Sequence, residues 1–259
     1  MKFPANLPND QWLSMLERSA RMPVDGLPKF PSKDLQARWV GRADAETIKE
    51  AGTLYRLIKK HRDIKKDNIL DFGSGWGRVS RFFLNDLKPD HIFGVDTNAF
   101  ILDECARIGV PGTFQLIDPL GALPYPDKMF NLVFAYSVFT HLSERSASHW
   151  IPEIRRVLKP GGIFVPTLIT EHILQMCVDA TSESAPEGIK PMATWFEEPH
   201  TLLDRYRQGQ FIFSKDRESD LYGWASVPPI YIQNHWGFGQ IEFVENLGFD
   251  QGAIVLRVD

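Results

Sequence analysis

The sequence predicts an α/β fold built around a doubly wound, mostly parallel sheet. Short apolar runs such as "NILDF" and "HIFGVD" are typical of buried parallel strands. A segment with helical periodicity follows most of them. Three glycines, Gly73, Gly75 and Gly77, stand directly after the first run, in "ILDFGSGWG". Repeated strand–helix alternation with right-handed crossovers gives a doubly wound sheet, and ligands bind at the carboxyl ends of its strands.

Residues 1–66 predict an N-terminal helical arm or cap. Residues 1–43 are rich in proline and aromatic side chains, and we expect an irregular segment with one short helix near "DQWLSMLERSA". A longer helix is expected from Asp44, where apolar side chains recur at the helical period on one face, at Ile48, Ala51, Tyr55 and Ile58.

Residues 67–170 predict the core of the sheet. We expect strands at "NILDF", "HIFGVD", "GTFQLID", "FNLVFAYSVF" and "GIFVPTLI". Helices are expected at "RVSRFFLNDL", at "NAFILDECARIG", which Gly109 ends, and over 143–158, where Pro152 kinks or restarts the helix. Residues 171–239 are expected to form an inserted cap, with a hairpin expected at "FIFSKDRESDLYGWASV", and residues 240–259 are expected to hold the last two strands.

The composition is that of an ordinary globular protein. The 259 residues are 43% hydrophobic and carry a net charge of −4. No apolar run approaches the ~20 residues of a membrane span, and no signal core opens the chain. The two cysteines suggest no disulfide framework, and no cluster of metal ligands is visible, so we expect a cytoplasmic protein with a metal-independent reaction and no membrane partner.

The charge is unevenly distributed. Residues 1–66 hold 14 Lys and Arg against 8 Asp and Glu, whereas the remainder is acidic. The basic segment either faces an anionic acceptor or is a solvated helical face. The sequence contains no continuous basic patch, so we do not expect nucleic acid to be the acceptor.

The residues around the glycines predict the cofactor. Glycine permits positive φ and close approach of a ligand to the backbone. Dinucleotide sites use G-x-G-x-x-G, whereas the spacing here is G-x-G-x-G with Asp71 just before it. A carboxylate at Asp71 suits a cationic amine better than a pyrophosphate. Asp96, at the end of the second strand, is placed to bind both ribose hydroxyls. S-adenosylmethionine has an ammonium group and an adenosine ribose but no phosphate, and it satisfies both acids.

Four segments in this order resemble the class I S-adenosylmethionine-dependent methyltransferases, and more loosely the bacterial small-molecule and sugar methyltransferases. They are "ILDFGSGWGRVSRFF", "IFGVDTN", "LPYPDKMFNLVFAYSVFTHLS" and "EIRRVLKPGGIFVPT". The resemblance covers roughly residues 67–170, with a weaker echo in "EFVENLGFDQGAIVLRVD". It implies a seven-stranded Rossmann-like sheet with helices on both faces. Asn131 departs from the pattern, because an Asp usually follows the residue at Phe130.

The resemblance also implies roles for individual residues. Gly73 and Gly75 lie against the methionine part of the cofactor and Asp71 near its amino group, directly or through water. Ser74 flanks the pocket. Asp96 holds the ribose, with Thr97 beside the adenosine. Asp118 meets the adenine amino group, although its spacing to "LP" is one residue longer than usual. Ala135 and Tyr136 face the methionine part.

The sulfonium already activates the methyl group, so the protein must align an acceptor and exclude water. A hydroxyl acceptor also needs a base, and histidine is the usual one near pH 7. His141, just past the fourth strand, is the candidate; the alternative is a structural histidine bonded to the backbone.

The inserted cap is expected to cover the acceptor. It holds Trp195, Trp224 and Trp236, which either stack on a sugar or ring or form the insertion's own core. The predicted function is transfer of a methyl group to a small-molecule or glycan acceptor, most simply at a hydroxyl. A non-catalytic S-adenosylmethionine-binding protein and a nicotinamide-dependent oxidoreductase are the alternatives. The acceptor and the oligomeric state do not follow from the sequence.

Overall fold

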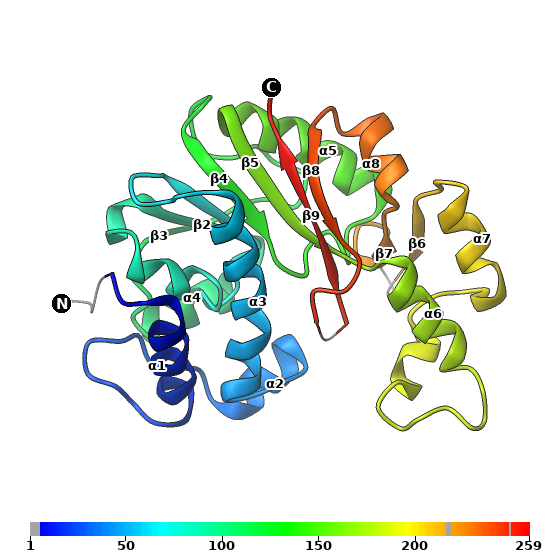
Figure 1. Cartoon of the computed structure of the whole chain (residues 1–259), viewed down its shortest axis with the longest axis horizontal. Coiled ribbons are helices and arrows are strands. Elements are labelled where there is room, and N and C mark those ends of the chain that lie inside the picture. The colour runs from blue at the N-terminus through cyan, green and yellow to red at the C-terminus, as the bar shows by residue number, and fades with distance from the viewer. Residues whose placement is uncertain (1–5, 216–218, 249) are drawn as a thin grey trace. The chain divides into compact units, whose positions relative to one another are not determined.

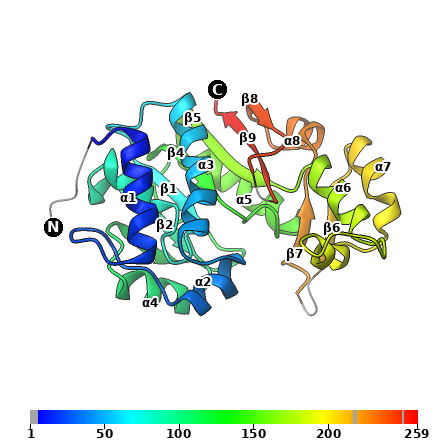
Figure 2. The ribbon, with the colours of Figure 1, turned by 60° about the horizontal axis from the view of Figure 1, so that its bottom comes forward.

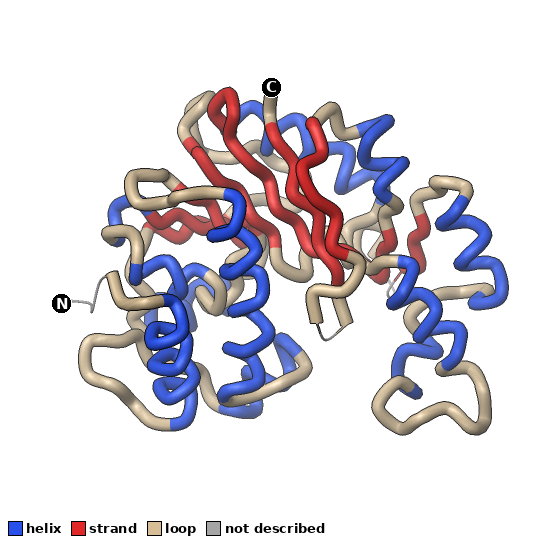
Figure 3. Tube along the Cα trace, in the orientation of Figure 1, coloured by secondary structure: helices blue, strands red, loops and turns tan. Residues whose placement is uncertain are grey.

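The computed structural model describes residues 6–215, 219–248 and 250–259. It contains a seven-stranded sheet in the order β3-β2-β1-β4-β5-β9-β8 (Figure 1). The strands are β1 (Ile69–Phe72), β2 (Ile92–Asp96), β3 (Thr113–Leu116), β4 (Phe130–Ala135), β5 (Leu158–Leu168), β8 (Gly239–Val244) and β9 (Gly252–Arg257). Helices flank these strands, as the blue and red segments of Figure 3 show. The predicted α/β fold with a mostly parallel sheet is therefore confirmed.

The chain forms two compact units. The first comprises Met1–Asp118 and Phe130–Tyr136, and the second comprises Pro119–Met129 and Ser137–Asp259. Of the sequence motifs, the glycine-rich loop lies in the first unit and His141 in the second.

In the first unit, β1 pairs in parallel with β2 on one side and β4 on the other. Its helices are α1 (Asn9–Arg21), α2 (Lys33–Val40), α3 (Ala45–His61) and α4 (Ala99–Arg107), with 3-10 helices η1 (Ser80–Asn85) and η2 (Pro89–His91). Helices α1 and α3 lie side by side in both Figure 1 and Figure 2. The predicted apolar face of α3 is fully buried at Ile48, Ala51, Tyr55 and Ile58. Gly109 follows α4 with a φ of 75°, as a helix-ending glycine should.

Two elements of the first unit differ from the prediction. Helix α2 was not expected within the arm; Ser32 caps its start by accepting a hydrogen bond from the Leu35 N–H, and Gly41 ends it in the left-handed conformation. The segment after the glycine loop is the 3-10 helix η1 rather than an α-helix. All six of its residues are buried, so packing on every side fixes its backbone instead of one amphipathic face.

Strand β4 is also shorter than predicted. It ends at Ala135 and does not continue to Phe139. The reason is local, because Ser137 has a φ of 56°, which an extended strand does not allow.

In the second unit, β9 pairs antiparallel with both β5 and β8. Helix α5 (Glu144–Val157) leads into β5, and α8 (Pro229–His235) precedes β8. Pro152 lies inside α5 without ending it, and β5 begins earlier than predicted, directly after Val157.

The insertion forms part of the second unit. It contains α6 (Glu171–Asp179), η3 (Lys190–Thr194), η4 (Pro199–Thr201), α7 (Leu202–Arg207) and the antiparallel hairpin β6 (Ile212–Lys215) and β7 (Gly223–Ser226). The turn residues 216–218 of the predicted hairpin lie outside the described residues. The insertion has its own apolar cluster, which includes Ile173, Cys177 and Leu202, and Trp195 and Trp224 pack against it. Trp236, 3% exposed, instead stacks near Phe139 and Phe164.

Each unit buries one cysteine. Cys105 packs with Trp76 in the first unit and Cys177 packs with Ile173 in the second. Burial raises the pKa of each thiol to about 12. Among the described residues, no helix combines the length and apolar character that a membrane crossing requires.

Candidate cofactor site and acceptor-side residues

The glycine-rich loop turns sharply at the carboxyl end of β1. Gly73, Gly75 and Gly77 have φ values of 79°, 53° and 72°, a region that side chains disfavour. The backbone N–H groups of Gly73 and Ser74 both donate to the Val95 carbonyl, at 2.8 and 2.9 Å. The loop is therefore fixed against the end of β2.

Asp96 is held at the tip of β2 by backbone donors. The Gly75 N–H donates to its Oδ2 at 2.8 Å, and the Asn98 N–H donates to Oδ1 at 2.9 Å. Burial raises the pKa of Asp96, and these N–H groups together with that of Thr97 oppose the rise. The carboxylate is thus oriented in advance, which is what a ligand with two neighbouring hydroxyl groups requires.

Asp71 lies beneath the loop and is 1% exposed. The Ser80 hydroxyl donates to its Oδ2 at 2.6 Å. Burial raises the pKa of Asp71 to about 7; the nearby Asp96 adds to the rise, while Ser80 and Arg78 oppose it. A carboxyl in this state gains from a cation, because a positive charge favours its ionised form.

Exposed apolar side chains surround the Asp96 tip. Leu116 pairs in register with Asp96 and is 57% exposed, and Phe100, in the first turn of α4, is 61% exposed. Thr97 and Asp118 are exposed nearby; the Ile117 N–H, one residue before Asp118, donates to the Asp96 carbonyl at 3.0 Å.

A buried polar network lies at the end of β4. The Tyr136 hydroxyl donates to Glu50 Oε1 at 3.0 Å, and Arg78 Nη1 donates to Glu50 Oε2 at 3.2 Å. The Arg78 guanidinium also stacks over the Tyr136 ring at 4.6 Å. Ala135 beside it is fully buried, and Arg42 lies 3.6 Å from Glu50. Glu50 was not predicted.

The arm also reaches the glycine loop itself. A Cβ at Gly75 would lie 3.3 Å from the Trp39 indole nitrogen. Trp39 belongs to α2, the helix that the sequence did not predict.

The polar side chains around the glycine-rich loop fit S-adenosylmethionine. Asp96 is a preoriented acceptor for hydroxyl groups, and Asp71 is an acid that a cation stabilises. The buried Ser74 hydroxyl has no hydrogen-bond partner among the described residues, so it offers a further polar contact. No phosphate-binding cation is needed for such a ligand.

His141 is oriented by the backbone of the second unit. Its Nδ1 lies 2.7 Å from the Gly223 carbonyl oxygen. A carbonyl only accepts, so Nδ1 carries the proton and Nε2 holds the lone pair of the neutral ring. The ring stacks on Tyr222, with centroids 5.0 Å apart, and contacts Trp224 at 4.7 Å. The histidine is therefore both bonded to the backbone and in the tautomer that a base requires.

The family comparison covers the glycine loop and the strands that follow it. Residues 69–162 match the model of a methyltransferase domain. The chain carries a class I S-adenosylmethionine-dependent methyltransferase domain. The predicted family and the predicted Rossmann-like fold are thus confirmed.

Known methyltransferases resemble this domain over part of their length. "Probable methyltransferase ltbC" of Aspergillus luteorubrus is 28% identical over 162 residues, which is 58% of this chain and 54% of that protein. A fatty-acid O-methyltransferase of Mycolicibacterium smegmatis is 29% identical over 115 residues, 44% of this chain and 41% of that protein. The chain thus spans about half the length, or less, of these two relatives.

A solved S-adenosylmethionine-dependent methyltransferase from Mesorhizobium loti shares the fold. The two structures superpose with a TM-score of 0.54 at 15% sequence identity. The alignment covers 79% of this chain and 95% of the Mesorhizobium loti chain.

The first compact unit contains all the residues predicted to bind the cofactor: Asp71, Gly73, Ser74, Gly75, Asp96, Thr97, Asp118, Ala135 and Tyr136.

Proposed function

We propose that the protein transfers a methyl group from S-adenosylmethionine to a hydroxyl of a small-molecule or glycan acceptor. The observation that carries this proposal is the Asp96 carboxylate, which two backbone N–H groups hold at the end of β2, above a buried Asp71. The spacing of the glycines and the family match support the same cofactor.

Each part of the first unit has a role in this proposal. Asp96 accepts hydrogen bonds from the ribose hydroxyls, and Leu116 and Phe100 provide apolar surface for the adenine, with Thr97 and Asp118 at its edge. Asp71 balances the ammonium charge. Gly73, Ser74, Gly75, Ala135 and Tyr136 line the methionine part. When bound, the cofactor supplies an activated methyl on a sulfonium.

His141 is the proposed base. Its Nδ1–H bond to the Gly223 carbonyl places the lone pair of the neutral ring on Nε2, the atom proposed to take the acceptor's hydroxyl proton while the new carbon–oxygen bond forms. The bound cofactor would supply the methyl group, and its neutral thioether product would account for the electron pair of the broken carbon–sulfur bond. The backbone bond also fixes the ring orientation, which a base needs in order to act on a defined acceptor atom.

The acceptor is proposed to present an apolar or ring face. Around His141, the half-exposed Tyr222 and the partly buried Trp224 form an aromatic surface, and such surfaces bind planar or apolar groups. The fatty-acid O-methyltransferase among the relatives supports oxygen as the methylated atom.

This function assigns a role to each segment. Residues 1–66 are the N-terminal cap, residues 67–170 with 240–259 the cofactor-binding core, and residues 171–239 the acceptor-side lid. Deleting residues 175–225 is therefore expected to abolish acceptor turnover but not cofactor binding.

Calorimetric titration with S-adenosylhomocysteine tests the cofactor site. We expect micromolar binding that Asp96→Ala weakens at least about tenfold, a loss of roughly 1.4 kcal/mol. Asp90→Asn, an exposed acid just before the same strand, is the matched control and should bind like the wild type. Preferential binding of NADH would instead favour an oxidoreductase.

Labelled-methyl transfer to a panel of hydroxylated ring and fatty acceptors then tests the reaction. Product with a methyl ether or ester identifies oxygen as the acceptor atom. Tight S-adenosylhomocysteine binding without transfer to any acceptor would favour a non-catalytic binding protein.

A further inference from the structure

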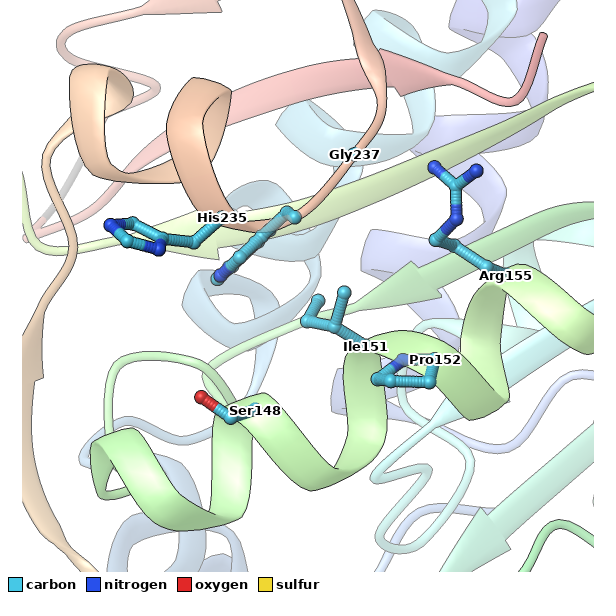
Figure 4. A pocket seen from close by; sticks show the side chains of 7 residues that line it. Ser148, Ile151, Pro152, Arg155, His235 and Gly237 are labelled. Carbon is cyan, nitrogen blue, oxygen red and sulfur yellow. The ribbon is translucent and has the colours of Figure 1, made fainter.

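A cavity of about 490 Å³ opens in the second unit, between α5 and the connection from α8 to β8. Figure 4 shows Arg155 and His235 at opposite ends of its lining, with Ile151 between them. Its volume falls in the range of small-molecule sites, ~300–1,000 Å³. None of its lining residues belongs to the proposed cofactor or base residues.

Arg155 differs sharply from its neighbour Arg156. The Arg156 guanidinium donates to the Glu153 and Asp127 carboxylates and to two backbone carbonyls. The Arg155 Nη1 atom is buried, yet no described residue accepts a hydrogen bond from it. A buried charged donor is unfavourable unless it is paired, so an anion drawn to the partly exposed Arg155 side chain would compensate its charge.

The contacts that hold Arg155 in place supply no acceptor. Its guanidinium lies 5.0 Å from the centroid of the Phe238 ring. Gly237 has a φ of 65°, and a Cβ there would lie 3.1 Å from Arg155 Nη1. Because Gly237 has no side chain, it leaves room for the Arg155 guanidinium at the cavity wall. It does not neutralise the charge of that group.

The rest of the cavity is apolar in the middle and polar at the far end. Ile151 and Trp236, 4% and 3% exposed, form the apolar surface. At the far end, Ser148 contributes a hydroxyl, and its carbonyl lacks the usual helical donor because Pro152 has no N–H. His235 lies there beside Tyr231, with ring centroids 4.3 Å apart.

Beside this end, the carboxylate of Glu144 already has a hydrogen-bond partner. Glu144 accepts a hydrogen bond from the Tyr231 hydroxyl at 2.5 Å. Among the described residues that line the cavity, Arg155 has the only guanidinium, and its planar fork matches one carboxylate.

We propose that this cavity binds a small amphipathic carboxylate. The carboxylate pairs with Arg155, the apolar body covers Ile151 and Trp236, and a hydrogen-bonding substituent reaches Ser148. Arg155 stands near the carboxyl end of α5, and Glu144 at its start is about 16 Å away at 1.5 Å per residue. His141 precedes that start, so this site is separate from the proposed base.

Benzoate is the probe, with benzamide as its uncharged counterpart. Ligand-observed NMR titration of the full chain is expected to show millimolar benzoate binding and at least about tenfold weaker benzamide binding. Arg155→Gln should weaken benzoate by about tenfold or more. Arg145→Gln, which removes an exposed arginine from the same helix, is the matched control and should bind like the wild type.

Gly237→Ala provides a second variant that keeps the charge. Its methyl group must push the guanidinium aside by a few tenths of an ångström, so we expect weaker benzoate binding with benzamide unaffected. Equal affinity for benzoate and benzamide, unchanged benzoate binding in Arg155→Gln, or no millimolar binding at all would each overturn the proposal. Circular dichroism checks that the variants fold, and S-adenosylhomocysteine binding, measured in parallel, separates this site from the cofactor site.

Discussion

The hydroxyl of Tyr136 donates a hydrogen bond to the carboxylate of Glu50, with 3.0 Å between the two oxygens. This bond joins the end of β4 to helix α3, and Arg78 joins both of them to the glycine loop through the other oxygen of Glu50. The Glu50 side chain is only 3% exposed. The three residues therefore act as one buried unit behind the proposed cofactor site.

Replacing Glu50 with alanine should lower the free energy of unfolding by about 3–5 kcal/mol, because Arg78 is left buried without its carboxylate. Urea denaturation measures the loss. Glu46→Ala, an exposed acid in the first turn of the same helix, should cost less than ~1 kcal/mol. Similar losses in both variants would show that the network contributes nothing beyond a surface charge.

Asp71 makes the free energy of unfolding depend on pH. The pKa of Asp71 is about 7 in the folded protein and 3.8 when unperturbed, so the folded state holds an additional proton between these values. The free energy of unfolding should therefore fall as the pH rises from 4 to 7, by an amount on the order of 2–4 kcal/mol from this group. Asp71→Asn should flatten that part of the curve.

Urea denaturation of the two proteins at pH 5 and pH 8 measures the effect. Asp103→Asn, which removes an exposed acid from α4, should keep the wild-type slope. An unchanged slope in Asp71→Asn would mean that burial does not hold the proton on Asp71.

Alanine substitutions at Gly77 and Gly109 distinguish the energetic cost of backbone strain from that of side-chain crowding. Both have φ near 75°, but a Cβ at Gly77 would lie 2.8 Å from Val110 Cγ1, whereas nothing lies within 4 Å at Gly109. Gly109→Ala should cost about 1–2 kcal/mol from conformation alone, and Gly77→Ala a further 1–3 kcal/mol from overpacking. Thermal denaturation compares them.

Val110→Ala should recover part of the loss in Gly77→Ala, because it removes the clashing methyl groups. If the two glycine variants were equally destabilised, the contact with Val110 would carry no energy.

His141→Gln should reduce kcat at least about 100-fold while the dissociation constant of S-adenosylhomocysteine changes less than about twofold. The reason is that the ring contributes a base and no predicted cofactor contact. Labelled-methyl transfer and calorimetry give the two quantities.

The control is His149→Gln. In the native protein, His149 Nε2 lies 2.6 Å from the Gly121 carbonyl oxygen, and this residue is not proposed to act in catalysis. Equal kcat in His141→Gln and the wild type would leave His141 with a structural role only.

The sequence predicted the fold well where short-range patterns determine it. The apolar period of α3 and the glycines after β1 correspond closely to buried and positive-φ positions. The all-buried η1 has no amphipathic period, so its 3-10 conformation was not predictable from pattern. The end of β4 at Ser137 depends on one backbone dihedral angle, which an apolar run hides.

The site was predicted only in its local part. Asp71 and Asp96 stand next to recognisable motifs, whereas Glu50 bonds to Arg78 after the loop from a distant helical arm. Contacts of this kind depend on tertiary packing and leave no spacing signal. The orphaned Nη1 of Arg155 likewise follows from three-dimensional neighbours, because Arg156 beside it has the same side chain and several partners.

The two buried thiols give each compact unit its own chemical reporter. Cys105 belongs to the first unit and Cys177 to the second, and in the folded state neither reacts readily, since each is shielded and protonated. Modification by an aromatic disulfide reagent must then wait for a transient opening of the surrounding unit. The two labelling rates, resolved by peptide mass spectrometry, report how often each half of the protein opens, and a ligand that slows only one of them reveals which half it binds.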